Sequence, residues 1–395
     1  MTTSGAGGRP DLHGPARRRA YHRALLLGLL RRHGPATRQE LVRRSGLSVT
    51  TVSSLATELE SRGLVTQRTV PQGRTGRRPV LVSFNRAAAS ALAVEVGARH
   101  LAVAVGGRSG TAVVERRVLR DRTDDSADAS QLTAVVEDAV GGLPSGPEAL
   151  LGAVVVAAAE LPGHAGRPAC GPEEEPGPHE VARLLADRWR VPVTVESGAA
   201  LGALAECSRG REAGARTVLN ISCGRRIASG IAVGGALHRG RTGSAGSLGH
   251  LVVRPGGRPC GCGRLGCLDA YLDQDALREI LGGGRGTDAR EAMRRPCPAG
   301  LRGADEAPVA LLAEAVAAAA LIVDPSVVVL GGPLASCGAW LVEPLQSALH
   351  ALPVPAAPVI CSALGWRAPL LGGVDLVLSE AESPEAEPAP GNGAR

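Results

Sequence analysis

The feature that most constrains this chain is a run of three cysteines within eight residues, in the segment PCGCGRLGCLDAY (residues 259–271). Glycines separate Cys260, Cys262 and Cys267 and let the backbone turn tightly enough for three thiolates to converge. A closed tetrahedral zinc site needs a fourth ligand, and His250, ten residues upstream, is the candidate. The segment therefore predicts a structural Zn²⁺ site. A free-thiol loop and a redox pair are the alternatives.

The other cysteines do not form a framework. The chain has nine cysteines, an odd number, spread over 395 residues without a secretion signal, so disulfides are not expected. The apolar run at residues 24–30 is at the short limit of a signal-peptide core, and two arginines close it without a small-residue cleavage site. No apolar run approaches the roughly 20 residues of a membrane helix. We expect a cytoplasmic protein without a membrane partner.

Positive charge is concentrated at one end of the chain. Residues 1–86 hold 16 arginines and four acidic residues, a net charge of +12, whereas the remaining residues carry −6. A small basic module joined to a mildly acidic body indicates a polyanion-binding end, with nucleic acid as the leading candidate. A solvated arginine surface would give the same pattern.

Helical patterns begin at Tyr21, after a basic stretch (residues 1–20) rich in Gly, Pro and Thr that we expect to be disordered. Leucines at helical spacing predict a first helix that ends at a Gly-Pro pair. Thr37 and Glu40 form a capping-box pattern at the start of a short second helix, residues 38–44.

A third helix follows Ser48, which has the right position to cap it, and ends at Gly63. Its buried stripe is expected to consist of Val49, Val52, Leu55, Ala56 and Leu59. The opposite face carries short hydroxyl side chains, which let a helix lie deep in the major groove of double-stranded DNA. With Ser48, these candidate DNA contacts are Thr50, Thr51, Ser53 and Ser54.

Two strand patterns, LVTQRTV and PVLVSF, flank the loop PQGRTGRR and form a hairpin. The loop carries Arg74, Arg77 and Arg78, which suit phosphate contacts or a narrow minor groove. Three helices and a hairpin over residues 21–85 predict a winged helix-turn-helix of the α+β class. A small helical interaction domain with a charged face is the alternative.

The body of the chain has an α/β pattern. Three short strands at residues 91–118 precede a helix, a strand, a second helix and a second strand. Two further strands follow, and then the segment PVALLAEAVAAAALIVDPSVVVLGG predicts a long helix that leads into a buried strand. Another helix and strand complete the pattern.

Several segments resemble the ROK family (repressors, open reading frames and sugar kinases). LIVDPSVVVLGGPLA and SALGWRAPLLGGVDL resemble its C-terminal lobe, and PVTVESGAALGALAE resembles the segment that bears its catalytic aspartate. GSAGSLGHLVVRPGGRPCGCGRLGCLDAY resembles its signature region, in which His250 matches the zinc histidine. SVTTVSSLATELESRGLV and GRTGRRP resemble the DNA-binding domain of its repressors.

The resemblance implies a bilobal actin/hexokinase-like fold after the winged helix-turn-helix. We place the first lobe at residues 90–205, the second lobe with its zinc loop at residues 206–381, and a disordered tail at residues 382–395. The resemblance also implies a homodimer or homotetramer that presents paired DNA-binding domains.

The kinase residues that the resemblance implies are altered. The position of the catalytic base is Gly198, which has no side chain, and Glu196 would point elsewhere. The first phosphate loop reads Glu-Val-Gly-Ala-Arg, and the second carries Arg225 and Arg226 where the family has a hydroxyl and a glycine. We expect no kinase activity.

The implied sugar site is altered as well. Its positions are Ser197, Gly198, Ser247, His250 and Asp269, and of these only His250 keeps the residue of the family. Arg225 and Arg226 favour an anionic effector such as a phosphorylated metabolite, whereas a solvated arginine pair is the alternative.

Three functions remain in competition. The leading hypothesis is a DNA-binding transcriptional regulator, a repressor of carbohydrate-related genes with a catalytically inactive ROK domain that responds to a sugar or sugar phosphate. The second is a sugar kinase with an accessory DNA-binding domain. The third is a DNA-binding dimer that senses no ligand.

Overall fold

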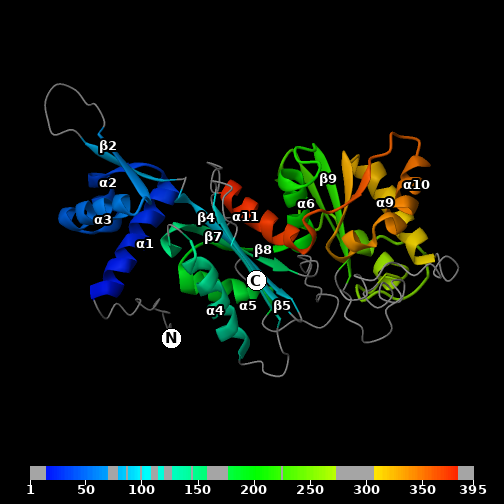
Figure 1. Cartoon of the computed structure of the whole chain (residues 1–395), viewed down its shortest axis with the longest axis horizontal. Coiled ribbons are helices and arrows are strands. Elements are labelled where there is room, and N and C mark those ends of the chain that lie inside the picture. The colour runs from blue at the N-terminus through cyan, green and yellow to red at the C-terminus, as the bar shows by residue number, and fades with distance from the viewer. Residues whose placement is uncertain are drawn as a thin grey trace, which may run out of the picture. The chain divides into compact units, whose positions relative to one another are not determined.

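The computed structural model describes residues 15–69, 79–85, 88–97, 100–107, 114–119, 127–143, 146–157, 177–223, 226–272 and 307–380. Within these ranges the chain forms two compact units (Figure 1). The first holds the described residues up to Ala89 together with Gly107 and residues 146–150, and the second holds the others. The predicted tail from residue 382 lies outside the described residues.

The first unit contains three helices and a small sheet. Along the chain its elements are α1 (Pro15–His33), β1 (Ala36–Thr37), α2 (Arg38–Ser45), α3 (Val49–Ser61), β2 (Val65–Thr69) and β3 (Val80–Phe84). β3 is the central strand and pairs antiparallel with both β1 and β2. The winged helix-turn-helix prediction is confirmed, and β1 is an addition to it.

The starts of α2 and α3 follow the predicted caps. The Glu40 carboxylate accepts from the Thr37 backbone N–H at 2.7 Å, and the Thr37 hydroxyl accepts from the Glu40 backbone N–H at 3.2 Å. The Ser48 hydroxyl accepts from the Thr51 backbone N–H at 3.1 Å. Each bond satisfies a backbone donor that has no partner within its helix.

α1 begins at Pro15, earlier than predicted. In the added part, Arg19 donates to the Glu58 carboxylate at 2.7 Å and to the Ser54 hydroxyl at 3.1 Å, both in α3. These contacts extend the helix, so the prediction of disorder was wrong for residues 15–20. Residues 1–14 lie outside the described part of the chain.

The core of the first unit is aliphatic. It includes Leu26, Leu27, Leu30, Leu41, Val52, Leu55, Ala56, Leu59, Leu64, Val82 and Ala149. The predicted stripe of α3 is confirmed except at Val49, which is 64% exposed. The core reaches α3 only from Val52 onward, one turn further along the helix.

Two carboxylates tie the helices of this unit together. Glu58 pairs with Arg19 and Arg23, and Glu148 pairs with Arg23 at 2.6 Å and with Arg62 at 2.9 Å. Burial alone would raise the pKa of Glu58, but the hydrogen bond from Arg19 and the charges of its arginine neighbours outweigh burial and lower it.

We expect Glu58→Gln to lower the free energy of unfolding of the first unit at pH 7 by about 1 kcal/mol. The loss is modest because water screens the exposed part of the network. The pKa of Glu58 is lowered from 4.5 in the folded chain. The stabilisation that the Glu58 carboxylate provides is therefore complete above pH 4.5 and is lost as the pH falls through the pKa of the folded state. Melting curves from pH 7 to pH 3 should therefore converge for the two proteins. Glu343→Gln, at an exposed position of α10 (Ala339–His350), is the control. A constant difference at all pH values would contradict the network.

The second unit contains two sheets. The strands of the first, in spatial order, are β6 (Val114–Leu119), β5 (His100–Gly107), β4 (Ser90–Gly97), β7 (Leu150–Ala157) and β8 (Val193–Ser197). β5 and β6 are antiparallel, whereas β7 and β8 are parallel. α4 (Ala127–Gly141) precedes β7, and α5 (Pro178–Trp189) precedes β8. The strand and helix order is as predicted.

The second sheet has the spatial order β11 (Ala236–Leu237), β10 (Ile227–Val233), β9 (Thr217–Cys223), β12 (Val327–Gly331) and β13 (Val359–Cys361). β12 is parallel to both β9 and β13. Leucines from β9, β12, α9 (Ala307–Val323) and α10 share a core with Leu268 and Leu272. The cysteine-rich loop therefore leads directly into this core.

Two glycine-containing helices are also found among the described residues of this unit. They are α6 (Gly198–Arg209) and α11 (Ala368–Glu380). A Cβ added at Gly372 would collide with the Leu201 carbonyl of α6, and one at Gly373 would meet Val154 of β7 at 2.5 Å. The predicted boundaries assign α11 to the second lobe, but its contacts are with α6 and with strands of the first sheet.

None of the helices among the described residues has the length and apolar character needed to cross a lipid bilayer.

Candidate metal centre and nucleic-acid interface

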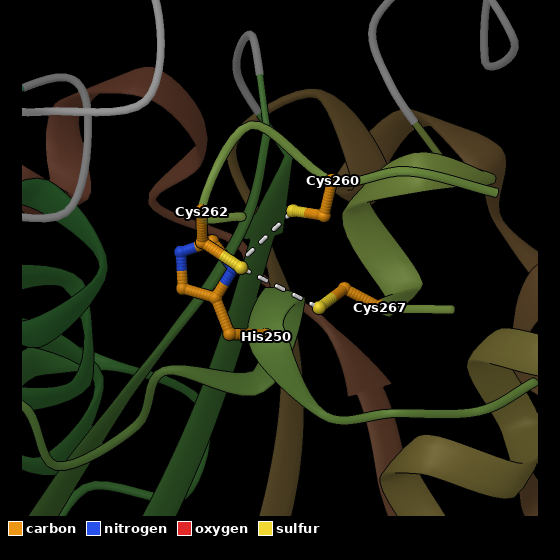
Figure 2. Close-up of side chains that lie close together, drawn as sticks. All are labelled: His250, Cys260, Cys262 and Cys267. Carbon is orange, nitrogen blue, oxygen red and sulfur yellow. Dashed lines mark hydrogen bonds between the residues drawn. The ribbon is translucent and has the colours of Figure 1, made fainter. Parts of the chain in front are cut away.

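Four potential metal ligands converge in the second unit. His250 ends a short 3-10 helix (Leu248–His250), and Cys260, Cys262 and Cys267 follow in the next loop. Their donor atoms all lie within 4.8 Å of one another. Figure 2 shows the four side chains pointing toward a common centre. The predicted ligand set is therefore brought together as a cluster that could hold a metal ion.

The donor spacing fits a tetrahedral ion. The Sγ atoms of Cys262 and Cys267 are 3.7 Å apart, and the Sγ atom of Cys260 is 3.7 Å from Nδ1 of His250. Zinc bonds of about 2.3 Å to sulfur and about 2.0 Å to nitrogen in a tetrahedron put neighbouring donors about 3.5 to 3.8 Å apart. The residues present therefore fit a Cys3His zinc site.

Short backbone bridges fold the loop back on itself. Val252 pairs with Cys267, and Pro259 pairs with Leu265, each as an isolated antiparallel bridge. The Cys260 backbone N–H donates to the Arg264 carbonyl at 2.8 Å. These bonds hold the three thiols on one side of a narrow loop.

Glycine is required at Gly266. Gly263 and Gly266 have φ angles of +84° and +81°, in the left-handed region that other residues rarely adopt. At Gly266 a Cβ would also collide with the Arg254 carbonyl. The prediction that glycines allow the tight turn is thus confirmed at these two positions.

Burial shifts the pKa of three of the four donors, whereas hydrogen bonds outweigh burial and lower the pKa of Cys262. Burial raises the pKa of Cys260 to about 11 and raises the pKa of Cys267, whereas it lowers the pKa of His250. Without a metal, Cys260 therefore holds its proton at neutral pH. A metal must displace protons from the thiols, so metal affinity falls as the pH falls.

Contacts beyond the ligands anchor the loop. The Tyr271 hydroxyl accepts from the Arg258 backbone N–H at 2.9 Å, and the Arg258 guanidinium lies 5.0 Å from the centre of the Tyr271 ring. Arg254 pairs with Glu314 of α9 at 2.9 Å. Leu268 and Leu272 are buried in the core beneath.

Asp269, a predicted effector residue, links this loop to β10. Its carboxylate accepts from the Ile227 backbone N–H at 2.9 Å and lies 3.4 Å from the Arg226 guanidinium. Burial raises the pKa of Asp269, and the hydrogen bond from Ile227 opposes that rise. Arg226 thus pairs with Asp269, the one acidic residue among the implied sugar-site positions. Arg225 lies outside the described residues.

The remaining effector candidates belong to neighbouring segments. Ser197 precedes α6, and the Ser247 hydroxyl donates to the Ser244 carbonyl at 2.9 Å. A Cβ at Gly230 of β10 would collide with the Ala199 carbonyl. Ser229, the preceding residue of β10, bonds the Gly246 carbonyl at 2.7 Å. The first turn of α6, β10 and the turn before His250 are therefore packed together.

One ion pair in this region was not predicted from the sequence. Glu196, at the end of β8, is 8% exposed and accepts from Nε of Arg239 at 2.6 Å. Arg239 also pairs with Glu380 of α11 at 3.1 Å. Glu196 is thus held by a residue 43 positions away in sequence, which no local motif links to it.

The hydroxyl face of α3 is placed as predicted. Ser48, Thr50 and Ser54 are exposed, and Thr51 and Ser53 are partly exposed. Ser54 also accepts from Arg19, which the sequence did not suggest. The candidate wing residues Arg74, Arg77 and Arg78 lie outside the part of the chain that the structure describes.

Comparison with protein families assigns both parts of the chain. The ROK family matches residues 91–380, and the MarR family matches residues 20–77. The MarR match covers α2, α3, β2 and all but the first five residues of α1, and the ROK match covers the described part of the second unit from residue 91.

Individual relatives have two kinds of function. A putative xylose repressor of Caldicellulosiruptor sp. is 25% identical over 66% of this chain and 65% of its own length. A glucokinase of Streptomyces coelicolor is 33% identical over 48% of this chain and 68% of its own length. The chain thus spans about two thirds of the length of each of these relatives.

A solved structure extends the likeness to the fold. A ROK family transcriptional regulator, described as a homolog of the E. coli MLC protein, has a TM-score of 0.57 at 18% identity. The match covers 92% of this chain and 96% of that one. An N-terminal MarR-type winged helix followed by an actin/hexokinase-like domain is therefore the architecture of this protein, and the chain belongs to the ROK family.

Proposed function

We propose that the protein is a DNA-binding transcriptional regulator, a repressor of carbohydrate-related genes. The observation that carries this proposal is the exposed hydroxyl face of α3 in a winged helix-turn-helix at the end of the chain with a net charge of +12. The MarR match and the relatives named xylose repressor support it.

In this proposal α3 enters the major groove with its N-terminal turn toward the bases. Ser48, Thr50, Thr51, Ser53 and Ser54 are short enough to allow close approach. Arg43 and Arg44, exposed in the last turn of α2, add positive charge for the phosphates. Arg74, Arg77 and Arg78 of the wing are proposed to contact phosphates or the minor groove.

A gel-shift measurement on the upstream region of the protein's own operon tests the proposal. We expect sequence-preferring binding that weakens as salt increases. Thr50→Glu should lower the affinity at least tenfold, since a carboxylate close to the DNA phosphates is strongly unfavourable. Ser244→Glu, at an exposed serine of the second unit, is the matched control. Equal binding by both variants would contradict the interface.

We propose zinc as the occupant of the His250, Cys260, Cys262 and Cys267 cluster. When bound, zinc would supply a structural cross-link, because a Cys3His set leaves no open coordination position. The donor spacing of 3.7 Å and the folded-back loop support this choice. The protein residues set the spacing and direction of the donors, and the loop is anchored independently by Tyr271 and Arg254.

We propose further that the ROK domain is catalytically inactive. Phosphoryl transfer needs a base beside the accepting hydroxyl, and Gly198 has no side chain at the implied position. A Cβ there would lie 3.2 Å from Cγ1 of Val156, so the backbone packs closely against β7. The His100 ring also packs on Gly97, at the implied first phosphate loop, and lies 3.5 Å from Glu95.

A coupled ATP assay with a panel of sugars should therefore show no turnover above the rate without protein. The alternative is a sugar kinase with an accessory DNA-binding domain, and the similarity to a glucokinase supports it. Sugar-dependent ATP consumption that persists after repurification, and that disappears when Gly97 and Gly198 are both replaced by bulkier residues, would establish that alternative.

A sugar or sugar phosphate is the proposed effector, and a homodimer or homotetramer is the proposed assembly. Asp269 pairs with Arg226 at 3.4 Å, and Arg225 precedes Arg226 in the sequence, so two arginines stand against one acid at the implied sugar position, which favours a phosphorylated sugar over a neutral one. A thermal-shift screen should show stabilisation by one ligand of this class. Stabilisation by none of them favours the third hypothesis, a DNA-binding oligomer that senses no ligand.

A further inference from the structure

An exposed aliphatic side chain lies at the start of α3. Val49 is 64% exposed, whereas the other apolar residues of its predicted stripe are buried to 1% or less: Val52, Leu55, Ala56 and Leu59. Among the large hydrophobic residues described in the first unit, only Tyr21 is also exposed, at 43%. Val49 is therefore exposed to solvent at a position where a helix on a protein surface normally carries a polar residue.

The hydroxyl groups around Val49 already have partners. The Ser48 Oγ lies 2.8 Å from Oγ1 of Thr50 and 2.8 Å from Oγ1 of Thr51, and it also accepts from the Thr51 backbone N–H. These three hydroxyls close the N-terminal cap of the helix. Val49 is the side chain of this turn that projects without a role in the cap.

The charges of the neighbouring residues favour nucleic acid as the binding partner of Val49. The first turn of α3 has no acidic residue, and α2 ends with the exposed Arg43 and Arg44 just before it. The helix N-terminus adds a partial positive charge that attracts phosphate. An exposed apolar residue at a helix start without acidic residues, preceded along the chain by two exposed arginines, suits the floor of a DNA groove better than an apolar protein partner.

We propose that Val49 determines sequence specificity by contacting the C5-methyl group of a thymine in the major groove. The inference rests on the proposed DNA-binding function. N-terminal residues of a recognition helix reach the base edges, and thymine is the base that presents a methyl group there. Valine has no donor or acceptor, so apolar contact is the means of recognition open to it.

The test begins with selection of preferred duplexes from a random library by the full chain. Each thymine of the preferred site is then replaced in turn by uracil, which differs only in lacking the methyl group. For the wild type we expect one position in each half-site where uracil weakens binding about fourfold, the value of one buried methyl group. For Val49→Ala the same replacement should change the affinity by less than about 1.5-fold.

Val233→Ala is the matched control, because Val233 is a 47% exposed valine of β10 in the second unit. It should retain the full uracil effect. An equal uracil effect in Val49→Ala and the wild type, or no uracil effect at any position, would overturn the inference while leaving DNA binding intact. Selection that yields no preferred duplex would overturn the inference and the proposed function together.

Discussion

Replacing Cys267 by serine is expected to remove the bound metal and to lower the melting temperature of the second unit by about 10 °C. Cys267 is fully buried and lies 3.7 Å from Cys262, so loss of its thiolate opens the ligand set. Loss of a structural metal costs on the order of 4 kcal/mol or more, and a unit of this size loses about 2–4 °C per kcal/mol. Metal content by mass spectrometry and melting by calorimetry measure both effects.

The control is Cys361→Ser, at a partly buried cysteine of β13 outside the cluster. It should keep one zinc per chain. A chelator provides a second route that needs no substitution: in the wild type it should expose the loop to trypsin after Arg264, whereas Arg254 and Arg258 precede prolines and resist the protease. Equal zinc content in the wild type and in Cys267→Ser would contradict the assignment of the ligands.

Replacing Gly266 by alanine is the second change with a large expected effect. Gly266 has a φ angle of +81°, which costs an alanine about 1–2 kcal/mol. The new Cβ would also collide with the Arg254 carbonyl, a backbone atom that cannot move aside without shifting the loop. We expect zinc affinity to fall at least tenfold, measured by competition with a chromophoric chelator, with a clear drop in melting temperature.

Comparison of Gly256→Ala with Gly266→Ala distinguishes the effect of the Cβ collision on zinc affinity from the effect of backbone strain. Gly256 has a φ angle of +72° in the same loop, but a Cβ there would meet no atom within 4 Å. This variant should lose only the strain energy and keep near-normal zinc affinity. If both variants bound zinc equally well, close packing at Gly266 would not be what shapes the site.

The sequence predicted features that depend on local spacing. The capping box of Thr37 and Glu40, the cap at Ser48 and the convergence of Cys260 with His250 all follow from short-range patterns. Hydrophobic periodicity likewise identified α9 and the strands of both sheets, except the two-residue β11. In each case the physical cause acts within about ten residues of the pattern.

Features that depend on distant residues could not be predicted. Arg239 approaches Glu196 only because β8 and the segment after β11 meet in the folded chain. The helices α6 and α11 are interrupted by glycines that permit their close contact, so they lack the usual one-sided apolar stripe. Val49 follows the buried spacing of α3 but lies beyond the end of the core.

The second unit combines an intact ligand cluster with an implied catalytic position that has no side chain. The loop from His250 to Cys267 connects to β10 through Asp269 and to α9 through Arg254. These contacts attach the ligand loop to the second sheet and to α9. A ligand cluster in the same unit as Gly198 supports the proposed regulator.

The central claim is that this protein reads DNA sequence. The most direct test is to measure the affinity of the full chain for its selected duplex and for a scrambled duplex across a series of salt concentrations. We predict at least about 1,000-fold tighter binding to the selected duplex at physiological salt, with both affinities falling log-linearly as salt increases. Equal affinity for the two duplexes at every salt concentration would contradict the account.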